Sequence, residues 1–152
     1  MKLDKTDFRI LDQLQSDGSL SNVELAKRVN LSPSPCLARV KALEGSGVIQ
    51  RYVALASAAA LGLGLTVFIS ISLKAQSKAS LAEFEAHIAR HNEIMECYLM
   101  TGDSDYLLRV VVPDLEAYER FVMDFTKIPG LAQIRSSFAL RPVKQGTALP
   151  LG

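Results

Sequence analysis

The sequence contains few of the residues that build disulfides, metal sites and catalytic centres. Its 152 residues include only two cysteines, Cys36 and Cys97, and two histidines, His87 and His91. The cysteines lie far apart and form no C-x-x-C pattern, which argues against a zinc site or a disulfide framework and fits a reducing, cytoplasmic location. The histidines have the i, i+4 spacing of a helical metal pair, but no third ligand lies near them in the sequence. We therefore expect an exposed polar helix face there, and we predict no metal and no cofactor.

The sequence also lacks a strong net charge and a signal peptide. The formal net charge is +1, and the opening residues MKLDKTD contain no apolar core. The charge is unevenly distributed, because residues 1–52 carry eight basic and six acidic side chains, whereas the remainder carries nine and ten. A local basic face can bind phosphate even on a nearly neutral chain. The basic residues that cluster late in the first segment are Lys27, Arg28, Arg39, Lys41 and Arg51.

No charged residue occurs from Tyr52 to Leu73, a length that would suffice for a membrane span. The first part of this stretch, ALASAAALGLG, is rich in alanine and glycine and only weakly apolar. The second part, LTVFISISLK, alternates buried and polar types with many β-branched residues, which is typical of a strand with one buried side. We interpret the stretch as a linker over residues 54–64 followed by a strand, and we predict no membrane segment.

Capping and apolar patterns predict two short helices before residue 31. Asp4 is placed to cap the first helix, and an apolar stripe that includes Phe8 is expected to face inward. The segment Ser21–Glu24 is a capping box, S-x-x-E, that starts the second helix. Asn30 tolerates the left-handed backbone conformation of a tight turn, so the second helix should end there.

A third helix follows in LSPSPCLARVKALEG, with two prolines at its start. The first N–H groups of a helix have no partner within it, so proline costs little there and its fixed φ suits the position. Either Ser32 or Ser34 can be the cap. The prolines then stiffen the tip of the helix and leave both serines exposed. The residues expected to face inward are Cys36, Leu37, Val40 and Leu43, with Cys36 acting as a small apolar residue.

Two short helices, a tight turn and a third helix with a basic outer face are typical of a helix-turn-helix, whose second motif helix enters the major groove of DNA. The residues 48–52 suggest a short strand beyond it. An ordinary three-helix bundle is the alternative interpretation. We expect four residues near base edges, namely Ser32, Ser34, Pro35 and Arg39, and five near phosphates, namely Asn22, Lys27, Arg28, Lys41 and Arg51.

The second half predicts strands and helices in the order βαββαβ, a ferredoxin-like α+β sandwich. A capping box at Ser80–Glu83 starts its first helix, and strands are expected at residues 94–101 and 106–112, joined by a turn at 102–105. A helix follows Pro113 and Asp114, and a last strand covers residues 132–143. The run 106–112 is apolar on both sides, so the sheet face opposite the helices should be buried against a second copy. Dimers suit a helix-turn-helix, because two helices then read two half-sites.

Two segments resemble a known family. LDKTDFRILDQLQSDGSLSNVELAKRVNLSPSPCLARVKALEGSGVIQRY is similar to the DNA-binding half of the leucine-responsive/AsnC (Lrp/AsnC) transcription regulators, and ECYLMTGDSDYLLRVVVPDLEAY is similar to the core of their effector domain. The resemblance covers nearly the whole chain. It implies a winged helix-turn-helix in residues 1–53, a linker in 54–64 and a ferredoxin-like effector-binding and oligomerisation domain in 65–152. It further implies dimers that assemble into larger rings, often octamers, with amino acids bound between dimers.

The effector site implied by the resemblance centres on Asp105 in the turn G-x-x-D-Y. An amino acid needs a carboxylate for its ammonium group and backbone N–H groups for its own carboxylate, and this turn offers both. On turn chemistry alone, an ordinary hairpin turn or a D-x-D metal site remains open. No charged residue marks the side-chain pocket, which favours a neutral, apolar effector such as leucine or methionine. The expected effector residues are Leu99, Thr101, Gly102, Asp103, Asp105, Ser136, Ser137 and Phe138.

These observations predict a sequence-specific transcription regulator whose assembly and DNA affinity respond to an amino acid. The expected partners are double-stranded DNA, the amino acid and further copies of the chain. An architectural DNA-wrapping protein without a working effector site is the alternative. No activated nucleophile or acid/base pair is visible, so an enzyme is not expected. The sequence does not specify the effector, the operator, the target genes, activation or repression, or the ring size.

Overall fold

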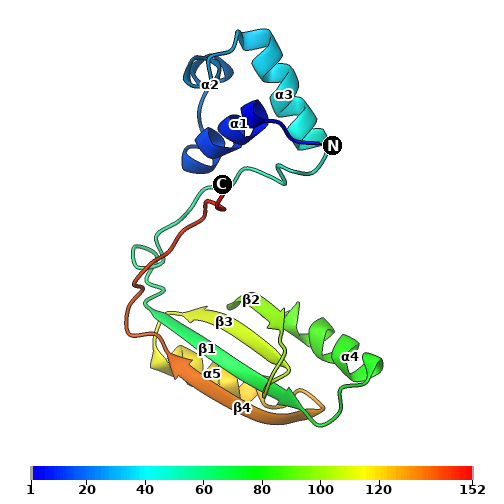
Figure 1. Ribbon diagram of the computed structural model, residues 1–152. Helices are drawn as coiled ribbons and strands as arrows, with labels where there is room; N and C mark the ends of the chain where they lie inside the picture. The colour runs from blue at the N-terminus through cyan, green and yellow to red at the C-terminus, as the bar shows by residue number, and fades with distance from the viewer. Residues whose placement is uncertain (1, 152) are drawn as a thin grey trace. The chain divides into compact units, whose positions relative to one another are not determined.

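The computed structural model describes residues 2–151, which form two compact units (Figure 1). One unit contains residues 2–55 together with residues 143–151, and the other contains residues 56–142. The segment 143–151, which we call the return segment, was predicted to belong to the second domain. It contacts the first unit instead, because Leu151 packs on the apolar core of that unit.

The first unit contains α1 (Lys5–Ser16), α2 (Asn22–Arg28) and α3 (Pro33–Gly45). Asp4 caps α1 in a reciprocal capping box with Asp7, and the Ser21 side chain caps α2 by accepting from the Glu24 N–H. Both caps agree with the prediction. Asn30, at φ 57°, makes the left-handed turn before α3. The core of this unit comprises Ile10, Leu11, Leu25, Ala26, Val29, Cys36 and Leu43.

Three predictions for the first unit were wrong in detail. Phe8 and Leu37 were expected to face inward but are exposed, because Ile10 and Cys36 occupy the core positions of their helices. The residues 48–52 form no strand. Between the two candidate caps of α3, Ser32 is the N-cap and Pro33 the first helical residue.

The second unit is a four-stranded antiparallel sheet in the order β2-β3-β1-β4 with α4 and α5 on one face, the predicted ferredoxin-like arrangement (Figure 1). In chain order its elements are β1 (Leu65–Leu73), α4 (Lys78–Ile88), β2 (Ile94–Leu99), β3 (Tyr106–Val112), α5 (Leu115–Phe125) and β4 (Leu131–Phe138). The uncharged stretch is therefore a linker and a strand. Among residues 2–151, none of the helices combines the length and apolarity that crossing a bilayer would need.

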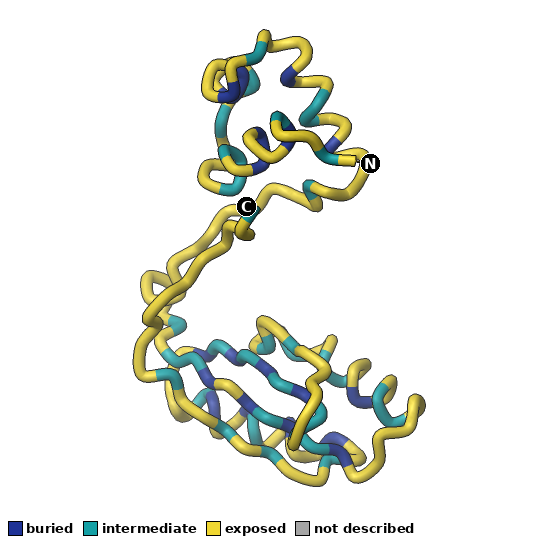
Figure 2. The backbone as a smooth tube through the Cα atoms, in the orientation of Figure 1, coloured by how far each residue is buried: buried dark blue, intermediate teal, exposed yellow. Residues whose placement is uncertain are grey.

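Alternate residues of β1 and β3 point to opposite faces of the sheet, which Figure 2 shows as alternating shades along these strands. The helix-covered face contains the core, where Phe84, Phe121 and Phe125 of the helices pack on the strands. The other face, which we call the open face, includes Phe68 of β1 and Leu107 of β3, and these are at best half-buried. Apolar residues thus remain accessible on one side of a well-packed sheet.

Several boundaries in the second unit differ from the sequence prediction, and one of them is the end of β2, which is Leu99 and not residue 101. The cap of α4 is Ser77, whose side chain accepts from the Ser80 N–H, so the helix begins one turn before the predicted capping box at Ser80–Glu83. The strand β4 ends at Phe138, five residues before the predicted end, because its pairing with β1 stops near the start of β1.

Candidate functional site

The first turn of α3 presents small polar and rigid residues to solvent. Ser32, Ser34 and Pro35 are all exposed, as expected, and the Ser32 hydroxyl makes no capping hydrogen bond. The Asn22 side-chain amide donates to the Pro33 carbonyl oxygen at 2.8 Å, which ties the start of α2 to the start of α3. Asn22 was predicted at a phosphate. The structure shows that it also fixes the position of the α3 tip, which suits a helix that must fit a groove.

The exposed face of α3 includes residues that the sequence interpretation missed. Leu37 and Ala38 lie one turn beyond the tip and are exposed, together with Lys41. Leu37 was expected in the core because leucine is usually buried. In the structure Cys36 occupies the core position, so α3 is turned about its own axis relative to the predicted orientation and Leu37 faces solvent. An exposed apolar side chain on such a face can contact a thymine methyl group in the major groove.

The remaining predicted phosphate contacts lie on exposed segments. Lys27 and Arg28 occupy the last turn of α2, where cations interact favourably with the helix dipole. Arg28 also donates to the Gln13 side-chain oxygen at 3.4 Å, and its guanidinium stays exposed. Lys41 of α3 and Arg51 beyond it are exposed as well. All four are available for phosphate.

Arg39 differs from the prediction that it contacts a base edge. Its Nη1 atom lies 2.8 Å from both Asp4 Oδ2 and Asp7 Oδ1, so the guanidinium joins α3 to the capping box of α1. The Asp7 side chain is only 5% exposed, which makes Arg39 the partner of a buried carboxylate. Arg39 therefore has a structural role in the free protein, and its contact with a base edge stays a prediction.

The same contacts lower the pKa of Asp4. The Asp7 N–H and the Arg39 guanidinium donate to its carboxylate and hold its pKa at about 2, below the ordinary 3.8. Because the folded pKa is the lower one, this stabilisation is fully present above pH 3.8 and is lost as the pH falls toward 2. The junction of α1 and α3 is thus fully formed near neutral pH.

We predict that Asp7→Ala destabilises the first unit by about 1–3 kcal/mol, because it removes a buried hydrogen-bonded carboxylate and half of the capping box. Urea unfolding, with circular dichroism of the helices as the readout, measures this change. Asp12→Ala on the exposed side of α1 is the matched control and should change stability by less than about 0.5 kcal/mol. Equal stability of both variants would contradict the structural role of this cluster.

The predicted effector turn between β2 and β3 is built around Asp105. Its carboxylate Oδ2 accepts from the Leu73 N–H at 2.7 Å and from the Gln76 side-chain amide at 3.5 Å. Its own N–H donates to the Ile71 carbonyl oxygen at 2.8 Å, and its carbonyl oxygen accepts from the Met100 N–H at 2.8 Å. Asp105 thus holds the turn against the end of β1.

The residues just before Asp105 leave polar groups accessible. Thr101, Gly102 and Asp103 are exposed, and Gly102 has φ 114°, a conformation that favours glycine. The hydroxyl of Ser72 on β1 donates to the Asp103 carbonyl oxygen at 3.4 Å. The turn therefore presents an accessible carboxylate on Asp103 beside the ordered carboxylate of Asp105.

A small polar pocket of about 40 Å³ lies beside this turn on the open face. It is too small for an amino acid and fits a water-sized group. The sequence interpretation missed most of its residues, although the alternation of β1 and β4 indicates which of them share a face. The pocket is lined by Ser70, Ser72, Asp103, Ser104, Gln133 and Arg135.

The predicted effector residues on β4 are not brought together with the turn in one chain. Ser136 pairs with Ile69 and accepts a hydrogen bond from the Tyr118 hydroxyl on the helix-covered face, whereas Ser137 points to the open face. Phe138 packs edge-on against Tyr118 with ring centroids 5.0 Å apart. Leu99, by contrast, pairs with Tyr106 beside the turn, on the edge of the sheet opposite to β4. A site that contains all these residues requires more than one chain.

The cysteines and histidines lie in packed surroundings. Cys36 is fully buried, and burial raises the pKa of the Cys97 thiol to about 11. His91 lies beyond the end of α4, which stops at Ile88, so it does not share a helix with His87 as predicted. Instead it packs on the edges of Phe121 and Phe125. In the part of the chain that the structure describes, no three His, Cys, Asp or Glu side chains cluster as a metal site.

Comparisons with known proteins agree with this arrangement. The Lrp/AsnC ligand binding domain matches residues 66–149, and the winged helix-turn-helix DNA-binding family matches residues 3–50. The chain is 43% identical over 148 residues to the leucine-responsive regulatory proteins of Salmonella typhimurium and of Escherichia coli K12, covering 97% of this chain and 90% of each relative.

Two solved structures are similar over almost their whole length. One is a transcriptional regulator of Neisseria meningitidis in complex with L-Met, with a TM-score of 0.95 and 43% identity, covering 99% of this chain and 97% of that one. The other is an AsnC family transcriptional regulator from Agrobacterium tumefaciens, with a TM-score of 0.95 and 40% identity, covering 98% and 97%. The chain therefore belongs to the Lrp/AsnC family and is a DNA-binding transcription regulator with the ligand-binding domain of that family, and this family is not one of enzymes.

Proposed function

We propose that this protein is a sequence-specific, cytoplasmic regulator whose assembly and DNA affinity respond to a neutral, apolar amino acid such as leucine or methionine. The DNA-binding part of the proposal is supported by the first turn of α3. Its serines are exposed, its start is fixed by Pro33, and Asn22 holds it in place. A rigid, exposed helix tip flanked by lysine and arginine is what major-groove recognition needs.

The open face of the sheet supports self-association into dimers. Phe68 of β1, 39% exposed, lies directly across from Arg109 of β3, and Leu107 and Val111 lie on the same face. Arg109 forms an ion pair with Glu96 at 2.8 Å, which neutralises the charge of this guanidinium on the open face. Burial of this face against a second copy would remove its apolar side chains from water.

We predict that Phe68→Glu converts the dimer to a monomer, because it replaces an apolar side chain at the centre of the interface by a carboxylate, whose desolvation is costly even beside Arg109. Sedimentation velocity measures the change in mass. The matched control is Met123→Glu on α5, whose side chain is 70% exposed and lies away from the open face. A dimer that persists in Phe68→Glu would show that copies associate through another surface.

The turn itself supports the effector part of the proposal. So does the separation between the turn and the predicted effector residues of β4, because a site that joins them needs a second chain. Asp105 is ordered by β1, Asp103 is exposed beside it, and the apolar Leu99 is 61% exposed on the edge strand β2. A neighbouring copy would close this half-site, as the proposed assembly into octamers allows. The complex of the Neisseria meningitidis relative with L-Met supports a neutral, apolar ligand for this chain as well.

The test of the proposed effector is thermal unfolding of the protein against each of the twenty amino acids. A ligand at a hundred times its dissociation constant adds about 2.7 kcal/mol to stability. We expect the largest shift with leucine or methionine and none with aspartate or lysine. A flat response to all twenty, together with equal affinity for specific and random DNA, would favour an architectural DNA-wrapping protein instead.

A further inference from the structure

The linker and the residues that lead to the return segment meet the sheet of the second unit at the same end. The strands β1 and β4 are neighbours and antiparallel, with Val67 paired to Phe138. The pairing extends one step further, because the Ala139 N–H donates to the Thr66 carbonyl oxygen at 3.0 Å. Residues 56–64 therefore enter the sheet, and residues 139–142 leave it, at one point.

Both segments are also anchored at the first unit. On the linker side, the Tyr52 hydroxyl donates to Glu44 Oε1 at 3.1 Å, and its ring packs beside Gly18. On the other side, the return segment binds α1 through the Gln15 side chain. Gln15 Oε1 accepts from the Leu149 N–H at 2.6 Å, and Gln15 Nε2 donates to the Leu149 carbonyl oxygen at 3.2 Å.

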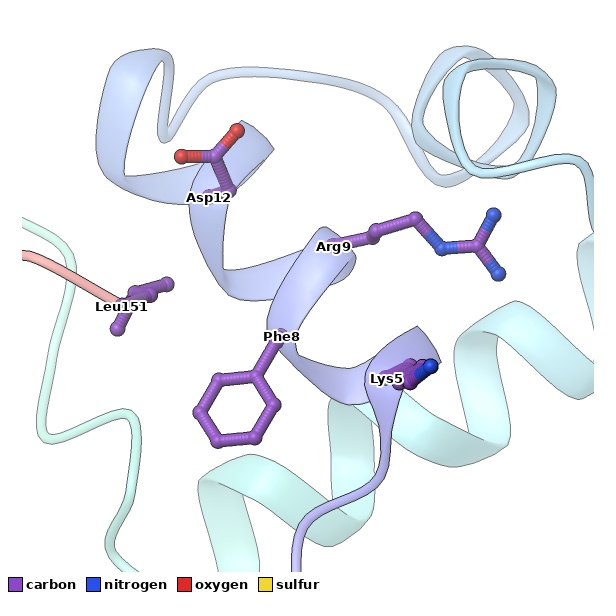
Figure 3. A pocket seen from close by; sticks show the side chains of 5 residues that line it. All are labelled: Lys5, Phe8, Arg9, Asp12 and Leu151. Atoms are coloured by element: carbon purple, nitrogen blue, oxygen red, sulfur yellow. The ribbon is translucent and has the colours of Figure 1, made fainter.

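Leu151 completes this contact with an apolar side chain. It packs on the core of the first unit and lines a groove along α1 with Lys5, Phe8, Arg9 and Asp12 (Figure 3). The figure shows Phe8 and Leu151 on the same side of the helix. This position explains why Phe8 lies outside the core: it faces the groove that the return segment enters. The contact is small and its hydrogen bonds are exposed, so it can open without unfolding either unit.

We propose that the return segment is a second tether that restricts where the DNA-binding unit can be placed relative to the effector domain. One linker would let that unit explore a wide range of positions. A second attachment, through α1, removes much of this freedom. It would also let a movement of the ends of β1 and β4 displace the helices of the first unit. The inference rests on the proposed function, because the restriction matters only when two DNA-binding units of an assembly bind one DNA.

The first experiment measures docking by hydrogen–deuterium exchange of the full-length protein without DNA or amino acid. The Leu149 amide should exchange more slowly in the wild type than an unbonded amide does, because it donates to Gln15. Leu151→Asp should release the segment and abolish this protection. Leu149→Ala is the matched control, since its side chain is 71% exposed and only its backbone is used. An unprotected Leu149 amide in the wild type would overturn the inference.

The second experiment measures the restriction on DNA. Inserting half a helical turn, about 5 base pairs, between two half-sites should weaken wild-type binding by at least about fivefold, because the tethered units cannot follow the rotated half-site. Two release variants, Leu151→Asp and Leu149→Pro, should bind both spacings within about twofold, and Leu149→Ala should behave as the wild type. Release variants as sensitive to spacing as the wild type would overturn the tether. The amino-acid response is measured separately, so a failure of the effector proposal is seen there and not in the spacing dependence.

Discussion

Asp105→Asn is expected to abolish the effect of the amino acid on DNA binding while the protein keeps its fold. Asparagine retains an oxygen that can accept from the Leu73 N–H, so the turn should still be held against β1. It lacks the negative charge that pairs with the ammonium group of an amino acid. Loss of one charged partner in a closed site costs about 2–4 kcal/mol, which lowers the affinity for the effector by about 30-fold or more.

Isothermal titration of the amino acid, followed by DNA binding with and without it, measures this prediction. The matched control is Glu83→Gln on the exposed side of α4, which makes the same change of charge away from the turn. Unchanged effector affinity in Asp105→Asn would show that this carboxylate only organises the hairpin. The alternative of an ordinary turn would then be the better description of residues 102–105.

Ser34→Glu is expected to lower DNA affinity by about 100-fold while slightly stabilising the protein. Ser34 is exposed in the first turn of α3, where a carboxylate interacts favourably with the helix dipole and contributes about 0.3–1 kcal/mol. The same carboxylate, placed against DNA, meets the phosphates and base edges with the wrong charge. The two effects have opposite signs, so loss of folding cannot explain loss of binding.

Fluorescence anisotropy with labelled DNA and thermal unfolding measure the two effects. Ala79→Glu is the matched control, because Ala79 occupies the same exposed helical position in α4 and should gain similar stability without loss of DNA binding. If Ser34→Glu binds DNA as well as Ala79→Glu does, the start of α3 does not enter the groove, and the ordinary three-helix interpretation regains support.

Local sequence signals predicted most of the elements because their causes are local. The caps at Asp4 and Ser21 bond to N–H groups within three residues, and the alternation in β1 follows from its own side chains. Ser77 was missed because Ser80–Glu83 fits the capping pattern equally well. Only the structure shows that the Ser77 side chain accepts a hydrogen bond from the Ser80 N–H.

The features that the sequence failed to predict depend on contacts between distant residues. Arg39 occupies a position typical of an exposed basic face, yet its long side chain reaches Asp4 and Asp7 of α1. The contact of the return segment with the first unit was not predicted, because its partner, Gln15, lies at the other end of the sequence. No local pattern encodes such pairs.

The candidate effector site was predicted only in part for a geometric reason. The turn at 102–105 was found because a glycine and two aspartates mark it. Ser136 and Ser137 were both included because the family resemblance implies that their positions lie beside the effector, although neighbouring residues of a strand point to opposite faces. Their separation from the turn in one chain is also why the proposed site requires a second copy.

The most direct test of the account is the affinity for specific DNA, measured with and without the amino acid that stabilises the protein most. We predict a change of about 5- to 150-fold in the wild type and none in Asp105→Asn. An amino acid that stabilises the protein but leaves its DNA affinity unchanged would contradict the proposal, because binding at the effector site would then not be coupled to DNA.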